Sequence, residues 1–166
     1  MQVRTRCFQS LDYEDLCRVH DAARLQEMKI GGVEKYFIPF KEAPYWYNFF
    51  DSEIRIVEVN NEFAGFAAYK PHNLAYFYID PQFQRRGIGD QLLASVLPNI
   101  RRPIRLEVFS ANIAAKALYA KHGFKIIKTV KESWWSDPKS EPVSSDTMGD
   151  CKIVCVRMND SLNLFL

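Results

Sequence analysis

Residues 84–89 read Gln84-Arg85-Arg86-Gly87-Ile88-Gly89 and join an apolar run at 74–79, which predicts a strand, to a helical pattern that Pro98 closes. The first N–H groups of a helix have no intrahelical partner and lie at the positive end of its dipole, so an anion is favoured there. The two glycines let a diphosphate approach the backbone, and the two arginines add positive charge. Alone the signal is weak, because two glycines in such a turn also serve tight packing.

The rest of the chain switches between a period near two and a period near 3.6, which predicts strands and helices in one sheet-based domain over residues 1–166. Further helices are expected from Ser10 to Gly31 and from Asn112 to Gly123. Residues 136–150, rich in Ser, Asp, Pro and Gly, are predicted to be a surface loop. The other expected strands cover residues 3–8, 54–59, 63–69, 104–109, 124–130 and 152–158.

A second motif occupies residues 106–124 (LEVFSANIAAKALYAKHGF). Together with the glycine loop, and in the same order and spacing, it resembles the Gcn5-related N-acetyltransferase (GNAT) superfamily. The match extends coarsely over residues 3–158. The resemblance implies an α/β (α+β) fold: a mixed, mostly antiparallel sheet of about seven strands with helices on both faces. It also implies an enzyme that transfers an acetyl group from acetyl-CoA to a primary amine by direct attack in a ternary complex.

The resemblance assigns binding of coenzyme A to two segments and the helix that follows. Backbone groups of the strand ending at 79 would pair with the pantetheine arm like an added strand. The loop N–H groups would hold the pyrophosphate, and Asn112 would contact the arm, although an N-cap role is equally compatible. The implied cofactor-binding residues are Phe77, Tyr78, Ile79, Gln84, Arg85, Arg86, Gly87, Ile88, Gly89, Asp90, Asn112, Ala115 and Tyr119.

Two residues are the catalytic candidates. The resemblance makes Tyr119 the general acid toward the departing thiolate; the alternative is a tyrosine that packs on one helix face. An alkylammonium has a reference pKa of about 10.4 and must lose a proton before its nitrogen attacks. Glu107 is the best candidate for the base that takes this proton. In the competing interpretation, Glu107 forms an ion pair with Arg105 and has no catalytic role. Weaker candidates for the base are Tyr76, Tyr78 and His72.

The acceptor pocket of the superfamily is built largely by the segment between the first helix and the second strand, here the aromatic run from Tyr36 to Phe50. We hypothesise that Tyr45, Trp46, Tyr47 and Phe49 wall this pocket, where an aromatic face holds an ammonium group. Phe37 and Phe40 are as well explained as core. Trp134 and Trp135 are candidates for the other side. The acceptor stays open among a small amine, an amino acid, an aminoglycoside, a peptide N-terminus and a lysine side chain.

Composition excludes other classes. There are 22 basic and 20 acidic residues, a net charge of +2, so nucleic-acid binding is not expected. No apolar run is long enough for a membrane span or a signal, which favours the cytoplasm. No metal is expected, although Cys151 and Cys155 would share one side of a strand.

The apolar tail, residues 162–166, leaves a homodimer open. A non-catalytic module that keeps the coenzyme A site is the alternative function.

Overall fold

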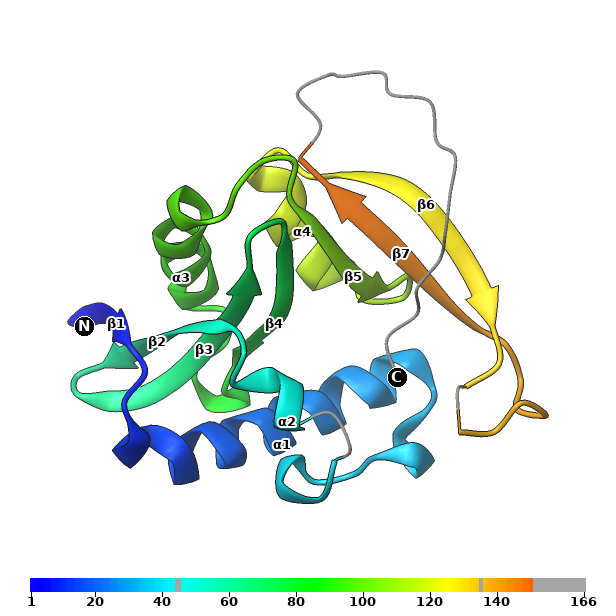
Figure 1. The fold of residues 1–166 in the computed structure, drawn as a ribbon, viewed down its shortest axis with the longest axis horizontal. Helices are drawn as coiled ribbons and strands as arrows, with labels where there is room; N and C mark the ends of the chain where they lie inside the picture. The colour runs from blue at the N-terminus through cyan, green and yellow to red at the C-terminus, as the bar shows by residue number, and fades with distance from the viewer. Residues whose placement is uncertain (44–45, 135, 151–166) are drawn as a thin grey trace.

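One sheet carries the fold. The computed structural model describes residues 1–43, 46–134 and 136–150 of the chain. Its seven strands lie in the order β1-β2-β3-β4-β5-β7-β6 (Figure 1), and of these strands β4 and β5 form the parallel pair while the other neighbours are antiparallel. The strands are β1 Val3–Cys7, β2 Glu53–Val59, β3 Glu62–Lys70, β4 Asn73–Ile79, β5 Arg105–Phe109, β6 Lys125–Glu132 and β7 Val143–Gly149. The predicted mixed, mostly antiparallel sheet is confirmed.

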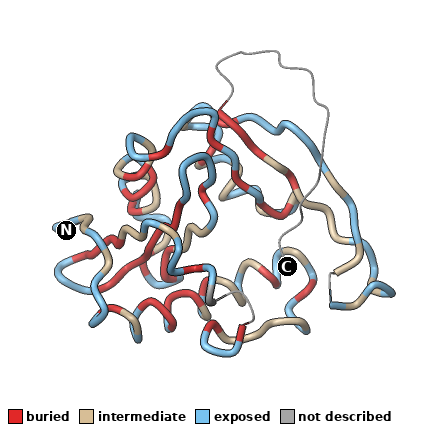
Figure 2. The backbone as a smooth tube through the Cα atoms, viewed as in Figure 1, coloured by how far each residue is buried: buried red, intermediate tan, exposed pale blue. Residues whose placement is uncertain are grey.

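Helices cover both faces of the sheet because side chains along each strand alternate between the faces. The helices are α1 Tyr13–Gly31, α2 Trp46–Phe49, α3 Ile88–Val96 and α4 Ile113–Lys121, and a short 3-10 turn, Ser10–Asp12, precedes α1. Ile56 of β2 packs in a core with Leu16 of α1, whereas its neighbour Val57 packs in a second core with Leu92 of α3. Figure 2 shows the buried backbone concentrated in the inner strands and on the sides of the helices that face them.

The sheet opens between its two parallel strands. β4 and β5 are paired only at Asn73 and Arg105, and from there they diverge (Figure 1). β5 pairs instead with β7 along its whole length, and β4 pairs with β3. In the described part of the chain, no strand therefore lies against the second edge of β4 at residues 77–79. Its backbone groups remain available for a ligand.

The prediction of a surface loop over residues 136–150 was wrong for β7, Val143–Gly149. The segment is polar, but β5 and β6 both pair with it, and the buried carboxylate of Asp146 accepts hydrogen bonds from Ser110 Oγ (2.8 Å), Thr129 Oγ1 (2.7 Å) and Lys116 Nζ (3.0 Å). These partners come from elsewhere in the chain, so the local composition does not reveal them. The predicted strand at 152–158 lies outside the described residues, as do Cys151, Cys155 and the apolar tail at 162–166.

Candidate active site

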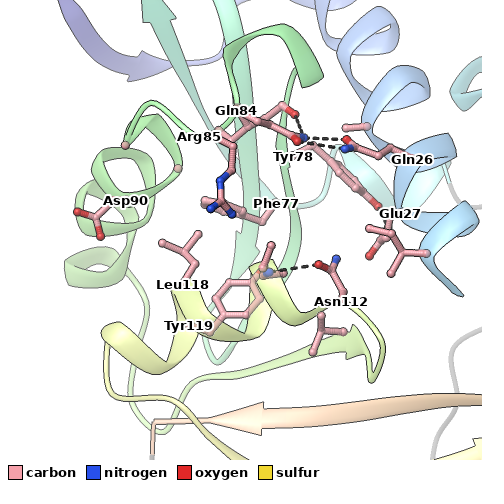
Figure 3. A pocket seen from close by; sticks show the side chains of 18 of the residues that line it. Gln26, Glu27, Phe77, Tyr78, Gln84, Arg85, Asp90, Asn112, Leu118 and Tyr119 are labelled. Atoms are coloured by element: carbon pink, nitrogen blue, oxygen red, sulfur yellow. Dashed lines mark hydrogen bonds between the residues drawn. The ribbon is translucent and has the colours of Figure 1, made fainter.

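A cavity of about 420 Å³ lies where β4 and β5 separate. Its walls come from α1, the end of β4, the loop before α3, β5 and α4, as Figure 3 shows for the labelled side chains. Most of the residues expected to bind the cofactor meet here, together with both catalytic candidates. The lining comprises Ala23, Gln26, Glu27, Ile30, Phe77, Tyr78, Ile79, Gln84, Arg85, Gly87, Gly89, Asp90, Glu107, Val108, Asn112, Ala114, Ala115, Leu118 and Tyr119.

The loop before α3 presents a run of free backbone donors. Gly87 is the N-cap of α3 and takes a left-handed φ of 77°, and Arg85 takes a φ of 62°. Among the described residues, no group accepts a hydrogen bond from the backbone N–H of any residue from 85 to 90, and the first helical bond of α3 is from Gln91 to Gly87. Such a turn at the positive end of a helix is an anion-binding site. The predicted loop therefore has the donors that a diphosphate requires.

The side chains of this loop divide between the cavity and its surroundings. Arg85 lines the cavity, whereas Arg86 lies over the ring of Phe83 at 5.8 Å and Ile88 is buried in the core beneath α3. A cofactor contact from the latter two residues would therefore be a backbone contact. Positive φ at a residue other than glycine is strained, and such strain is concentrated at functional sites.

Gln84 ties the loop to two neighbouring elements. Its Nε2 donates to the carbonyl of Ile79 at 3.0 Å and to Oε1 of Gln26 on α1 at 2.9 Å, and Gln26 Nε2 donates back to Gln84 Oε1 at 3.2 Å. These bonds appear as dashed lines in Figure 3. The loop is held against α1 and the end of β4, which fixes the position of its free N–H groups.

Asp90 joins the beginning of α3 to the end of α4. Its carboxylate accepts hydrogen bonds from Lys121 Nζ and from His122 Nε2, each at 2.8 Å. The hydrogen bond from Lys121 makes the largest contribution and that from His122 the next, and together they hold the pKa of Asp90 below its usual range. The two helices that border the cavity on this side are thereby linked.

Helix α4 carries Asn112 and Tyr119 into the cavity. Asn112 is the N-cap, and its Oδ1 accepts from the backbone N–H of Ala115 at 3.2 Å, so the capping role is confirmed. Tyr119 is 6% exposed and packs edge-on against Phe77, with ring centroids 6.1 Å apart. Burial, followed by the negative charge of Glu27, raises the pKa of the Tyr119 phenol. In the described part of the chain its hydroxyl has no hydrogen-bond partner, so its proton is available to a ligand.

Glu107 projects from β5 between two buried neighbours, Leu106 and Val108, and is itself exposed at the cavity. No described residue forms a hydrogen bond or ion pair with it, and Arg105 does not pair with it. A carboxylate at this position is free to take a proton from an acceptor amine. Of the weaker candidates, Tyr78 lines the cavity, Tyr76 packs against Phe49 with centroids 5.0 Å apart, and His72 lies in the turn between β3 and β4, away from the cavity.

The sequence model of the Acetyltransferase (GNAT) family matches residues 22–124, which include the loop, β5 and α4. The chain belongs to the GNAT acetyltransferase family. Over 133 residues it is 23% identical to YafP, an uncharacterised N-acetyltransferase of Escherichia coli K12, covering 76% of this chain and 83% of that protein.

Solved structures of GNAT proteins share the fold. A GCN5-related N-acetyltransferase from Rhodopseudomonas palustris superposes with a TM-score of 0.69 at 19% identity, covering 90% of this chain and 95% of that one. A ribosomal-protein-alanine N-acetyltransferase from Brucella melitensis gives 0.69 at 17% identity, covering 88% and 98%. As a GNAT protein, the chain is an N-acetyltransferase of a family that uses acetyl-CoA. None of the described helices is long and apolar enough to cross a membrane.

Of the four aromatic side chains expected to wall the acceptor pocket, the structure describes that of Phe49. Phe49 is buried in a core cluster with Phe40 and Phe66 and does not line the cavity. Tyr45 and Trp135 lie outside the described residues, as do the side chains of Trp46 and Tyr47, although both of the latter belong to α2. Tyr36 and Trp134 stack with centroids 5.7 Å apart, and neither is among the residues that line the cavity.

Helix α1 supplies site residues that sequence reasoning missed. Ala23 is buried on the inner face of this helix, and Gln26, Glu27 and Ile30 continue the same face into the cavity. Residues three and four apart share a helix face, so a carboxylate at 27 on the stripe of Ala23 was a visible signal. A charged residue on a face that packs against the sheet requires a partner, and here the partners are Tyr78 and Arg24.

Proposed function

We propose that this enzyme binds acetyl-CoA in the cavity between β4 and β5 and transfers the acetyl group directly to a primary amine. The observation that carries the proposal is that the loop at 85–90, whose N–H groups have no acceptor among the described residues, borders the same cavity as the side chain of Tyr119. The donor set fits a diphosphate, since bare N–H groups, a helix N-terminus and Arg85 all favour negative charge. Acetyl-CoA supplies an activated acyl group when it is bound.

The residues around the cavity then have distinct tasks. The open edge of β4 at residues 77–79 holds an extended chain through backbone hydrogen bonds, as an added strand would be held. Tyr119 holds the proton that a departing thiolate requires, and its raised pKa keeps that proton in place at neutral pH. Glu107 accepts, directly or through water, the proton that an alkylammonium must lose before its nitrogen attacks. Positioning of the two reactants supplies much of the rate.

The first experiment separates binding from catalysis. Titration calorimetry with acetyl-CoA and free CoA should show binding of both, and Gly87→Val, which places a branched side chain at a left-handed N-cap, should weaken both. Release of free thiol is then measured with acetyl-CoA and a panel of amines: simple alkylamines, amino acids, aminoglycosides, and peptides with a free N-terminus or a lysine. Thiol release that depends on one amine class supports transfer. Heat on binding without release for any amine would favour the non-catalytic module.

Two broader expectations remain proposals. We propose that residues 1–166 form one acetyltransferase domain, since the described helices and strands all pack on one sheet. Limited proteolysis in the presence of CoA should leave that domain intact, and stable separate fragments would contradict it. The amine class that releases thiol will also show whether the acceptor is a metabolite or a protein.

A further inference from the structure

The Glu27 carboxylate on α1 is a polar group in the cavity to which the roles above assign no task. It lines the cavity from α1, and in Figure 3 its side chain meets that of Tyr78 away from Arg85 and Asp90. Its side chain is 20% exposed. A carboxylate this far from bulk water is retained where it has partners, and it attracts positive charge.

The partners of Glu27 use one of its two oxygens. Oε2 accepts hydrogen bonds from Tyr78 Oη at 3.0 Å and from Arg24 Nη1 at 2.6 Å. In the described part of the chain, nothing donates to Oε1, and Oε1 is not among the buried polar atoms without a partner. One oxygen therefore anchors the carboxylate, and the other is accessible with its hydrogen-bonding capacity unused.

The anchored oxygen also fixes the orientation of the group. Arg24 is itself placed over the ring of Phe109 at 5.9 Å, and Tyr78 is part of β4. A carboxylate held in this way loses little conformational entropy when a ligand binds to it. Glu107 differs, because no described residue holds it and it is exposed. Both carboxylates line the cavity, and they are suited to different tasks: Glu27 to hold a cation and Glu107 to take a proton.

We propose that Oε1 of Glu27 binds the ammonium group of the acceptor, so that the enzyme selects alkylamines that carry a positive charge over uncharged molecules of the same shape. This inference rests on the proposed function, because it places the acceptor in the same cavity. The charged side chains that line the cavity favour a cation, because the carboxylates of Glu27, Asp90 and Glu107 face one arginine, Arg85. The proton of the ammonium passes to Glu107 before the nitrogen attacks.

The test uses a complex that cannot turn over. The full chain is saturated with free CoA, which carries no acetyl group, and benzylammonium and hexylammonium are titrated by calorimetry or saturation-transfer NMR. Benzyl alcohol and hexanol are the uncharged controls. In the unmodified protein each ammonium should bind about tenfold more tightly than its alcohol, the value of one charge-assisted hydrogen bond in a partly desolvated site. Glu27→Gln should remove this preference, and Glu107→Gln should keep most of it.

A further variant, Tyr78→Phe, tests whether a loss of the ammonium preference comes from the carboxylate and not from a disturbed structure. Tyr78→Phe removes one anchor and leaves the carboxylate, so the ammonium preference should shrink without vanishing, while CoA affinity stays the same in Glu27→Gln. Equal binding of ammonium and alcohol in the unmodified protein would overturn this inference and leave the proposed function standing. A preference for the ammonium that survives in Glu27→Gln would do the same. Failure of free CoA to bind would overturn the proposed function and this inference with it.

Discussion

Glu27 on α1 and Tyr119 on α4 line the same cavity, and burial, followed by the charge of Glu27, raises the pKa of the Tyr119 phenol above its ordinary value. The two residues are 92 positions apart in the chain (119 − 27). They line one cavity because β4 and β5 diverge after Asn73 and Arg105 and leave space between α1 and α4. A phenol in this environment stays protonated throughout the neutral range, so it is a proton donor and not a base.

Tyr119→Phe should therefore impair transfer without impairing binding. Loss of a positioned acid typically costs about 100-fold or more in kcat, while the hydroxyl contributes no described contact that holds the fold. Steady-state thiol release gives kcat, and calorimetry gives the CoA affinity, which should change little. An unchanged kcat would assign Tyr119 to packing against Phe77 and Phe124.

The same phenol makes stability depend on alkaline pH. Its folded-state pKa is raised above the unfolded value of about 10, so the folded state binds the proton more tightly. The resulting stabilisation is complete below about pH 10 and is lost as the pH rises through the higher folded-state pKa. Urea unfolding at a series of alkaline pH values should show this loss in the unmodified protein and a smaller loss in Tyr119→Phe. Identical slopes for both proteins would count against the raised pKa.

Arg85→Gly should separate stability from cofactor affinity. Arg85 takes a φ of 62°, a conformation that costs a non-glycine residue roughly 1 kcal/mol, so glycine should raise the free energy of unfolding by about that amount. Removal of a positive charge from the cavity should at the same time weaken CoA binding by about tenfold. Arg86→Gly is the matched control: its φ is not positive, so it should gain no stability. Equal stability changes in the two variants would contradict the strain argument.

Gly65→Ala should disturb the edge of β4 that faces the cavity. A Cβ at Gly65 would lie 2.5 Å from the backbone oxygen of Tyr78, which cannot move aside as a side chain can. We expect a loss of about 1–3 kcal/mol in the free energy of unfolding, and weaker CoA binding. In Gly89→Ala the added Cβ meets the protein's own side-chain atoms at 3.4 Å or more, so stability should change little. Chemical denaturation and calorimetry measure both, and a tolerated Gly65→Ala would show that β4 can shift freely.

Asp146→Asn should remove part of the acid sensitivity of the protein. Burial acts to raise the pKa of Asp146, but hydrogen bonds from Thr129, Lys116 and Ser110 outweigh it and lower the pKa below 3.8. The stabilisation is therefore present above the unfolded pKa and is lost as the pH falls through the lower folded value. The variant should be less stable by about 2 kcal/mol at neutral pH, with a flatter acid limb. Thermal unfolding at several acid pH values measures this, and parallel acid limbs would refute it.

Much of the fold was predictable because its signals are local. The turn at 84–89, the N-cap at Asn112 and the strands β2 and β3 each depend on residues a few positions apart, and the structure confirms these elements. Strand β7 was missed for the opposite reason. Its Ser, Asp and Thr residues resemble a loop until β5 and β6 supply backbone partners and three distant side chains satisfy the buried Asp146.

The amino-acid pattern alone was sufficient for the family, the glycine-bearing turn at 84–89 and the position of Tyr119 on its helix, since helix ends and strand periods follow from neighbouring residues. Folding in three dimensions was needed to bring Glu27 opposite Tyr119, to bury Phe49 in the core and to open β4 for an extended ligand. The physical reason is that a cavity arises where strands fail to pair, and its walls come from elements whose separation in the chain conceals their contact.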